Sequence, residues 1–333
     1  MLRVARRSLN YAANKESFIP KEGKYPLGFT VNAVASGVKK DKELDLSLIT
    51  SPKFPMTTAG VFTTNKFAAA PVLISKNQIQ LPNHQVLINS GCANACTGKE
   101  GYDNALQIIQ AVDSIFAPGT IVMSTGVIGQ HLQVPKLKSG IAELEKTLGN
   151  THHDWMRVAE GIMTTDTFPK LISTEFTGPS GTFRMVGIAK GAGMIHPNMA
   201  TMLAGIFTDA VVSKPNLDAV TRSVVESSFN AISVDGDTST NDTFIVCANG
   251  ASGTEVPIVE FQARLEKFAI DLAKLIVYDG EGATKFVDVR VEVKWFNYRE
   301  QTLLRMQRKF VELFVNRRLS RRHYMAKTQT GVE

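Results

Sequence analysis

A threonine that directly follows an alanine, behind a turn-forming segment, is the first candidate for chemistry in this chain. Thr201 follows Ala200 in the stretch KGAGMIHPNMATML, residues 190–203. If the backbone breaks between these two residues, the threonine becomes a new N-terminus whose free α-amine can act as general base for its own hydroxyl. An α-amine has an ordinary pKa of about 7.7 to 8.0, which suits that role near neutral pH. Taken alone, the segment is more typical of a loop that leads into a buried strand, TMLAGIF.

Other motifs along the chain change that interpretation. They are NSGCANACTG (89–98), STGVIG (124–129), MTTDTFPK (163–170), SFNAISVDGDTSTNDT (228–243) and GEGATK (280–285). Together with the stretch around Thr201, these motifs resemble the ornithine acetyltransferase family, also called the bifunctional glutamate N-acetyltransferase of arginine biosynthesis. The resemblance extends from about Phe18 to about Val293 in one consistent order.

The resemblance implies a reaction in which Thr201 acts twice. It first attacks the Ala200 carbonyl in an N-to-O acyl shift that splits the chain, and it then accepts an acetyl group from the donor substrate. An acetyl-threonine ester divides the exchange into two acyl transfers, which predicts ping-pong kinetics. N-acetylornithine and glutamate share one pocket, acetyl-CoA is a second donor in bifunctional members, and no cofactor is expected.

Acyl transfer also needs hydrogen-bond donors for the oxyanion of its tetrahedral intermediate. By resemblance to the family, Thr125 supplies its hydroxyl and Gly126 its backbone N–H. Glycine at this position lets the backbone approach the substrate closely. Without the resemblance, a threonine and a glycine after a strand indicate only a turn.

Three further residues match substrate-binding positions of the family. Lys190 and Glu281 provide a cation and an anion, which fits substrates that carry a carboxylate and, in ornithine, a side-chain ammonium. Thr164 matches a position that contacts the substrate as a hydroxyl donor. Which charge meets which substrate group stays open, and without the resemblance both charges read as solvated loop residues.

The sequence leaves two alternative functions open. The chain could be a non-catalytic relic of such an enzyme that acts as a binding protein through its basic tail. It could also be a related self-cleaving aminopeptidase, which shares the nucleophile but does not require the KGAGM and GEGATK motifs. Fragments split at Thr201 would distinguish an active enzyme from the relic.

Charge is distributed unevenly along the 333 residues, whose formal net charge is +6. Residues 294–333 hold ten Lys and Arg against three Glu, and residues 1–18 hold four against one. The remaining body, 19–293, is therefore acidic and does not call for a nucleic-acid partner. With 44% hydrophobic residues the chain can bury a full core.

The N-terminal segment MLRVARRSLNYAANKESF, residues 1–18, bears arginines, has one acidic residue and is amphipathic if helical. It is typical of a mitochondrial transit peptide, although an ordinary basic arm is the alternative. We expect import into the matrix, an α chain of residues 19–200, a partial β chain of residues 201–293 and an atypical tail of residues 294–333. Family members usually assemble as heterotetramers of two α and two β fragments.

Several other site types are not supported by the sequence. Cys92, Cys96 and Cys247 are too few and too unevenly placed for a disulfide framework, and they lack the partners of a zinc site. The stretch GCANACTGKEG lacks the spacing of a phosphate loop. VDGDTSTNDT is explained by turn chemistry more simply than by a cation. We therefore expect no metal, and no apolar run is long enough to span a membrane.

Hydrophobic periodicity alternates between strands and helices, which implies packed layers of an α/β (α+β) fold. The family resemblance implies a sandwich of β-sheets between helices, of the kind used by N-terminal-nucleophile enzymes. Helices are expected in four segments, the first capped by Asp103: 103–116, 134–150, 214–232 and 259–280. Strands are expected in seven: 60–77, 83–91, 119–126, 182–191, 201–212, 243–250 and 285–293.

The C-terminal segment departs from the family. Family members continue beyond the KFVDVRVEV strand with a segment that supplies an Asn and a Thr to the substrate pocket, and nothing here matches it. Residues 295–324 instead predict a basic amphipathic helix. We expect that a truncated or misread gene model replaces the native ending, and that this loss weakens substrate binding.

Overall fold

The structure is a computed structural model. It describes the backbone of residues 2–10, 15–40, 42–195, 202–234, 239–282, 285–293 and 323–328. Side chains are described within residues 15–288, with gaps at 41, 196–201, 235–238 and 283–285.

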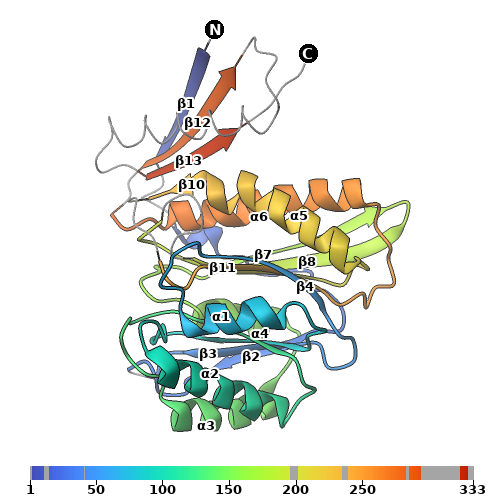
Figure 1. Ribbon diagram of the computed structural model, residues 1–333. Helices are drawn as coiled ribbons and strands as arrows, with labels where there is room; N and C mark the ends of the chain where they lie inside the picture. The colour runs from blue at the N-terminus through green and yellow to red at the C-terminus, as the bar shows by residue number, and fades with distance from the viewer. Residues whose placement is uncertain are drawn as a thin grey trace.

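The main body consists of alternating helical and sheet layers (Figure 1). The central five-stranded sheet has the order β4-β11-β9-β8-β7, in which only β9 and β11 are parallel neighbours. Its strands are β4 (Thr57–Phe62), β7 (Lys170–Gly178), β8 (Gly181–Lys190), β9 (Leu203–Thr208) and β11 (Thr243–Ala248).

A second, four-stranded sheet has the order β2-β3-β5-β6, with β5 and β6 parallel. Its strands are β2 (Thr30–Val34), β3 (Leu46–Thr50), β5 (Gln85–Asn89) and β6 (Thr120–Ser124). All but one of their residues are buried, as expected for a sheet that helices cover on both faces.

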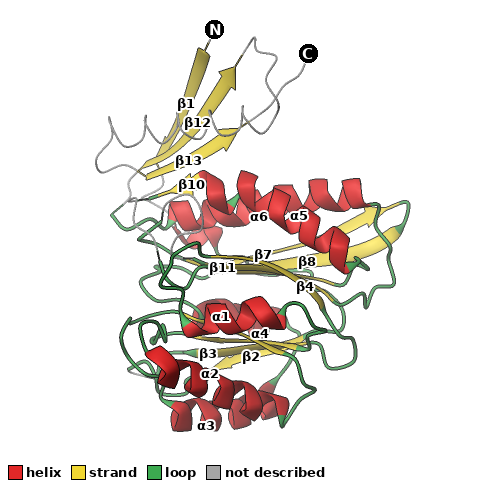
Figure 2. Ribbon diagram, viewed as in Figure 1, coloured by secondary structure: helices red, strands yellow, loops and turns green. Residues whose placement is uncertain are grey.

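Helices cover the outer face of each sheet and also fill the space between the sheets (Figures 1 and 2). The outer pairs are α5 (Lys214–Ser227) with α6 (Ile258–Tyr278), and α2 (Gly98–Asp113) with α3 (Val134–Thr147). The inner helices are α1 (Ala70–Gln78) and α4 (His152–Gly161). The predicted sandwich of sheets between helices is confirmed.

The hydrophobic core follows these layers. One cluster lies where α5 and α6 pack on the central sheet and includes Leu217, Phe261 and Leu272. Another lies between the sheets around the fully buried Trp155 of α4. A third packs α2 and α3 against the four-stranded sheet. Because both sheets are supported on both faces, the loops at the strand ends are attached to rigid elements.

A further sheet, β1-β12-β13-β10, is described by its backbone pairing. β1 (Leu2–Asn10) pairs antiparallel with β12 (Lys285–Val293), β12 runs parallel to β13 (His323–Thr328), and β13 pairs with β10 (Ile232–Ser233). Residues 2–10 thus form a strand, and not the amphipathic helix considered for the N-terminal segment. The helix predicted within 295–324 falls mostly on residues outside those described.

Two predictions about the helices are wrong. Residues 70–78, expected as part of a strand run, form α1, in which Pro71 stands at the first turn, where its missing N–H costs nothing. Asp103 does not cap α2, because that helix begins at Gly98 and Asp103 instead pairs with Lys99 within it. The sequence does not predict the helix α4 or the strands β1, β2, β3, β7, β10 and β13. The other predicted helices and strands are confirmed, with boundaries shifted by a few residues.

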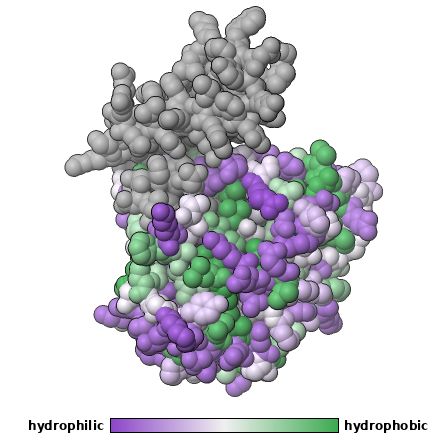
Figure 3. Space-filling view, in the orientation of Figure 1, coloured by the Kyte–Doolittle hydropathy of each residue, from purple (hydrophilic) through white to green (hydrophobic). Residues whose placement is uncertain are grey.

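The surface is of mixed character. Figure 3 shows a face on which hydrophilic and hydrophobic residues alternate, with hydrophobic residues gathered along its middle. Within the described part of the chain, no helix combines the length and the hydropathy needed to cross a bilayer.

Candidate active site

The candidate residues lie in loops and at strand ends that approach one another at one end of the strands of the central sheet. Thr125 and Gly126 directly follow β6, and Lys190 is the last residue of β8. Thr164 lies between α4 and β7, and Glu281 lies just after α6. Five segments far apart in the sequence therefore supply this site, once the start of β9 is included.

The predicted nucleophile and cleavage point lie outside the described residues, which exclude positions 196–201. Description resumes at Met202, the residue after Thr201. The Met202 N–H donates to Asp242 Oδ1 at 3.1 Å, and the Thr243 N–H donates to the Met202 carbonyl at 3.2 Å. The chain immediately beyond the predicted cleavage point is thus fixed against the start of β11.

Asn241 ties this strand entry to the predicted oxyanion loop. Its side-chain amide donates to the carbonyls of Ala93, at 2.6 Å, and of Ser124, at 2.9 Å. Ser124 immediately precedes Thr125. Because Asn241 itself adjoins Asp242, one short segment holds both the residue after Thr201 and the residue before Thr125.

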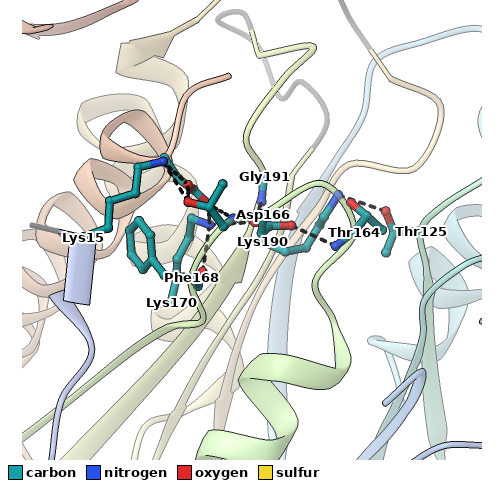
Figure 4. A network of polar contacts seen from close by, with 10 residues as sticks. Lys15, Thr125, Thr164, Asp166, Phe168, Lys170, Lys190 and Gly191 are labelled. Atoms are coloured by element: carbon teal, nitrogen blue, oxygen red, sulfur yellow. Dashed lines mark hydrogen bonds and ion pairs between the residues drawn. The ribbon is translucent and has the colours of Figure 1, made fainter. Parts of the chain in front are cut away.

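Thr125 and Lys190 are in direct contact. The Lys190 ammonium donates to Thr125 Oγ1 at 3.2 Å, and both side chains are buried (Figure 4). Burial lowers the pKa of Lys190, while the nearby carboxylates of Asp166 and Asp242 oppose that decrease. A hydroxyl whose oxygen accepts from an ammonium keeps its own hydrogen for another acceptor.

Gly126 adopts a backbone conformation that only glycine accommodates without strain. Its φ is +127°, and a Cβ at this position would lie 2.3 Å from the carbonyl carbon of Gly91. The flanking N–H groups are used: Thr125 donates to the Asn89 carbonyl and Val127 to the Gly91 carbonyl. Gly126 is an exposed residue, and none of the backbone hydrogen bonds among the described residues uses its N–H.

Thr164 is brought near Lys190 by the side chain of Asp166. The Thr164 N–H donates to Asp166 Oδ2 at 3.0 Å, and the N–H of Gly191, which follows Lys190, donates to Asp166 Oδ1 at 2.7 Å. The Lys39 ammonium donates to the Met163 carbonyl at 2.7 Å on the other side of the loop. Thr164 itself is exposed, so its hydroxyl can meet a ligand.

Glu281 packs against the loop that follows Lys190. Its N–H donates to the Ala192 carbonyl at 2.8 Å. Its carboxylate lies close to Gly193, where an added Cβ would be only 3.0 Å from the carboxyl carbon. The side chain is exposed. The structure thus brings together Thr125, Gly126, Thr164, Lys190 and Glu281 around the 190–193 turn.

Sequence reasoning missed a buried ion-pair network directly behind the site. Lys170 Nζ lies 2.6 Å from Asp166 Oδ1 and 2.7 Å from Asp279 Oδ2, and all three side chains are fully buried (Figure 4). Burial alone raises the pKa of Asp166, but the charges of Lys170 and Lys190 outweigh it and hold that pKa at about 2. Two of these residues, Asp166 and Lys170, stand in the MTTDTFPK motif, but they lie in a loop and at the start of β7, where the i,i+4 pairing rule of helices does not apply.

The family assignment rests on a match over most of the chain. The model of the ArgJ family matches residues 30–295 of the 333. The chain belongs to the ArgJ family.

Curated relatives and a solved structure agree with this assignment to the ArgJ family. The mitochondrial arginine biosynthesis bifunctional protein ArgJ of Neurospora crassa is 49% identical over 296 residues, covering 84% of this chain and 63% of the relative. The protein of the same name from Schizosaccharomyces japonicus is 46% identical, with 86% and 69% covered. The chain thus spans about two thirds of the length of these relatives. The crystal structure of the bifunctional protein argJ from Bacillus halodurans is 32% identical, with a TM-score of 0.50 over 59% of this chain and 99% of that one.

The N-terminal segment of this ArgJ family chain packs against the buried network. The Lys15 ammonium lies 2.8 Å from Asp279 Oδ1 and donates to Thr167 Oγ1 at 2.7 Å. The ring of Phe18 stacks on those of Phe168 and Tyr278, with centroid distances of 5.7 and 4.8 Å. Residues 15–18, which form a short 3-10 helix, are thus part of the packed body.

Metal ligands are not clustered in the part of the chain that the structure covers, where no group of three His, Cys, Asp or Glu side chains could hold an ion. Cys92 and Cys247 are free and buried, and Cys96 is free and exposed. Burial raises the pKa of the Cys92 thiol, whose Sγ donates to the Gln130 carbonyl at 3.3 Å. Asp242 accepts from the Met202 N–H, which gives one residue of the VDGDTSTNDT stretch a structural role.

Proposed function

We propose that this chain is an autocleaving acetyltransferase that moves acetyl from N-acetylornithine to glutamate through an acetyl ester of Thr201. The observation that carries the proposal is a Thr125 hydroxyl held by the Lys190 ammonium, next to the N–H of Gly126, which no backbone hydrogen bond among the described residues uses. Lys190 pairs in register with Leu203, the first residue of β9, which comes two positions after Thr201. Family membership supports the same reaction.

In the first half-reaction the Thr201 oxygen bonds to the acetyl carbon of N-acetylornithine as the carbon–nitrogen bond breaks. The hydroxyl proton passes to the α-amine of Thr201 and from there to the leaving ornithine nitrogen. In the second half-reaction the glutamate amine attacks the ester and restores the threonine hydroxyl. Acetyl-CoA is a second donor for the same ester, and the reaction needs no cofactor besides its substrates.

The oxyanion that forms in each half-reaction is stabilised by Thr125 and Gly126. Because Thr125 Oγ1 accepts from Lys190, the hydroxyl hydrogen is directed elsewhere, and the neighbouring ammonium makes the hydroxyl a stronger donor. One such donor contributes about 3 to 4 kcal/mol to the transition state in enzymes of this kind.

Substrate recognition falls to the charges that surround the 190–193 turn. Lys190 is the cation for a substrate carboxylate, and the exposed Glu281 is the anion for the side-chain ammonium of ornithine. The exposed Thr164 hydroxyl is the neutral polar contact.

Cleavage before Thr201 would give an α chain of residues 19–200 and a partial β chain of residues 201–293, followed by the basic tail 294–333. We place the enzyme in the mitochondrial matrix, directed there from within residues 1–18, in line with the fungal relatives that are named mitochondrial. The assembly proposed is a heterotetramer of two α and two β fragments.

Two measurements on the purified full chain test this proposal. A denaturing gel with N-terminal sequencing should find two fragments, the second starting Thr-Met-Leu. Incubation with N-acetylornithine and glutamate should release ornithine and form N-acetylglutamate. Thr201→Ala should abolish both, whereas the matched Thr201→Ser keeps a hydroxyl nucleophile and should retain some of each. An intact wild-type chain that transfers no acetyl would overturn the proposal and leave a non-catalytic relic.

A further inference from the structure

Asp166 is the residue at which the separate parts of the site are joined. Its two carboxylate oxygens accept from three donors: the Thr164 N–H at 3.0 Å, the Gly191 N–H at 2.7 Å and the Lys170 ammonium at 2.6 Å (Figure 4). These donors belong to the loop before β7, the turn after β8 and β7 itself. One side chain therefore fixes two segments that each carry a proposed substrate contact.

Lys170 does not depend on Asp166 alone for a counter-ion. Lys170 also pairs with Asp279, whose Oδ2 lies 2.7 Å from Nζ, so its charge has a second buried counter-ion. Asp279 in turn bonds to Thr167 and Lys15. Asp279 thus anchors the back of the network, whereas Asp166 faces the turn that holds Lys190.

Asp166 also acts on the charge of Lys190. The Lys190 side chain is buried, and a buried ammonium is costly unless a negative charge lies nearby. Burial lowers the pKa of Lys190, and among the groups that oppose this decrease the carboxylate of Asp166 is the strongest. The same carboxylate therefore holds the backbone next to Lys190 and favours its charged form.

We propose that Asp166 is a positioning residue of the site, whose carboxylate fixes the Thr164 loop against the Lys190–Gly191 turn and keeps the Lys190 ammonium in place on Thr125. Within the described residues its carboxylate bonds to Thr164, Lys170 and Gly191, so we infer that it acts through Thr164 and Lys190. The consequence for substrate binding rests on the function proposed above, but the consequence for Lys190 does not.

Asp166→Asn is the variant that separates these roles. An amide offers one acceptor oxygen and an NH2 group that donates, so the three donors around residue 166 cannot all be satisfied. We expect the KM for N-acetylornithine to rise about tenfold or more and kcat to fall less, because the binding contacts are displaced while Thr201 is retained. Asp166→Glu keeps the charge but shifts the carboxylate by one methylene, and should raise KM as well.

Asp209→Asn is the matched control. Asp209 is also a buried carboxylate that accepts two backbone N–H groups, from Leu27 at 2.8 Å and Arg184 at 2.7 Å. It lies just beyond β9, at the opposite end of the central sheet from Lys190. This variant should lower the melting temperature without changing KM.

A second readout needs no substrate. Brief treatment with acetic anhydride, followed by peptide mass spectrometry, reports how fast the Lys190 amine is acylated. Loss of the Asp166 charge should increase that rate several-fold in Asp166→Asn, since more of the amine is neutral and less firmly held. Asp209→Asn should leave the rate at the wild-type value.

The outcomes separate the two proposals. A wild type that transfers no acetyl, together with faster Lys190 acylation in Asp166→Asn, overturns the proposed function and keeps the positioning role. Folded Asp166→Asn and Asp166→Glu proteins with wild-type KM, or an Asp166→Asn protein with unchanged Lys190 acylation, would overturn the positioning role. If Asp166→Asn does not fold, the test uses Asp166→Glu. Its carboxylate is displaced by one methylene, so the positioning role requires a change in KM or in the rate of Lys190 acylation, and no change in either would overturn it.

Discussion

The two ends of the central sheet each bury an aspartate, and the two aspartates behave in opposite ways. Near the site, Asp166 has its pKa held at about 2, because Lys170 and Lys190 outweigh the effect of burial. At the other end, burial raises the pKa of Asp209 despite its bonds to backbone N–H groups and the charge of Arg184. A buried carboxylate is therefore kept ionised by ammonium groups around it, and in this sheet those groups lie at the end that carries Lys190.

The largest expected effect is a loss of stability when Lys170, the shared partner of the buried carboxylates Asp166 and Asp279, is removed. Lys170→Met leaves Asp166 and Asp279 buried without their common partner, which should lower the free energy of unfolding by about 3 to 5 kcal/mol. Urea denaturation measures this. The control, Lys214→Met, breaks a partly exposed pair with Asp218 and should cost less than about 0.5 kcal/mol. Equal losses in the two variants would remove the contrast between buried and surface pairs.

A smaller effect, on kcat, is expected when the Thr125 hydroxyl is removed. Thr125→Val keeps the shape of the side chain but removes the donor, and should lower kcat about 100-fold. Thr208→Val is the comparison at the other end, where the Thr208 hydroxyl donates to the Arg184 carbonyl at 2.8 Å. It should reduce stability by about 1 kcal/mol and leave kcat unchanged. Steady-state kinetics of both variants would contradict the oxyanion role of Thr125 if their kcat values were alike.

The two aspartates should also give opposite dependences of stability on pH. The folded pKa of Asp166 lies below its ordinary value of 3.8, so its contribution of about 2 kcal/mol is present above about pH 4 and is lost as pH falls toward 2. The stability gap between wild type and Asp166→Asn should therefore narrow on acidification. The folded pKa of Asp209 is raised, so its contribution is present at low pH and lost as pH rises.

The difference in stability between wild type and Asp209→Asn should therefore widen on acidification. Urea denaturation of the three proteins at a series of acidic pH values measures both gaps. If the difference in stability from wild type changed with pH in the same way for both variants, the ammonium groups near Asp166 would not control its ionisation.

The smallest effect is expected at the start of α4, the helix that leads to the Thr164 loop. Thr151 and Asp154 form a capping box, in which each side chain bonds to the backbone N–H of the other. Thr151→Ala should cost about 1 kcal/mol and leave the KM for N-acetylornithine unchanged. Thermal unfolding and kinetics check both parts. A changed KM would show that the far end of α4 controls the loop.

Much of the fold could be predicted from periodicity. The amphipathic stripes of α2, α3, α5 and α6 and the buried strands β5, β6, β8, β9 and β11 were visible because each spacing repeats locally. The helix α1 was missed because its apolar residues are nearly continuous, so neither period stands out. The helix α4 was missed although its capping box is readable in the sequence.

The site was only partly predictable. Motif resemblance named Thr125, Gly126, Thr164, Lys190 and Glu281, which the structure brings together. It did not identify the partners that position them, because Lys170 and Asp279 are 109 positions apart and no local pattern links them. Long-range ion pairs depend on the topology of the sheets, which periodicity does not specify.

The docking of Lys15 and Phe18 has a consequence for maturation of the chain. A peptidase that cut after Phe18 would remove one of the two ammonium groups on Asp279 and bare the rings of Phe168 and Tyr278 to water. A cut upstream of Lys15 would leave both contacts in place. The fold thus sets a limit on how far a peptidase can shorten the N-terminus without loosening the end of the central sheet that holds Lys190.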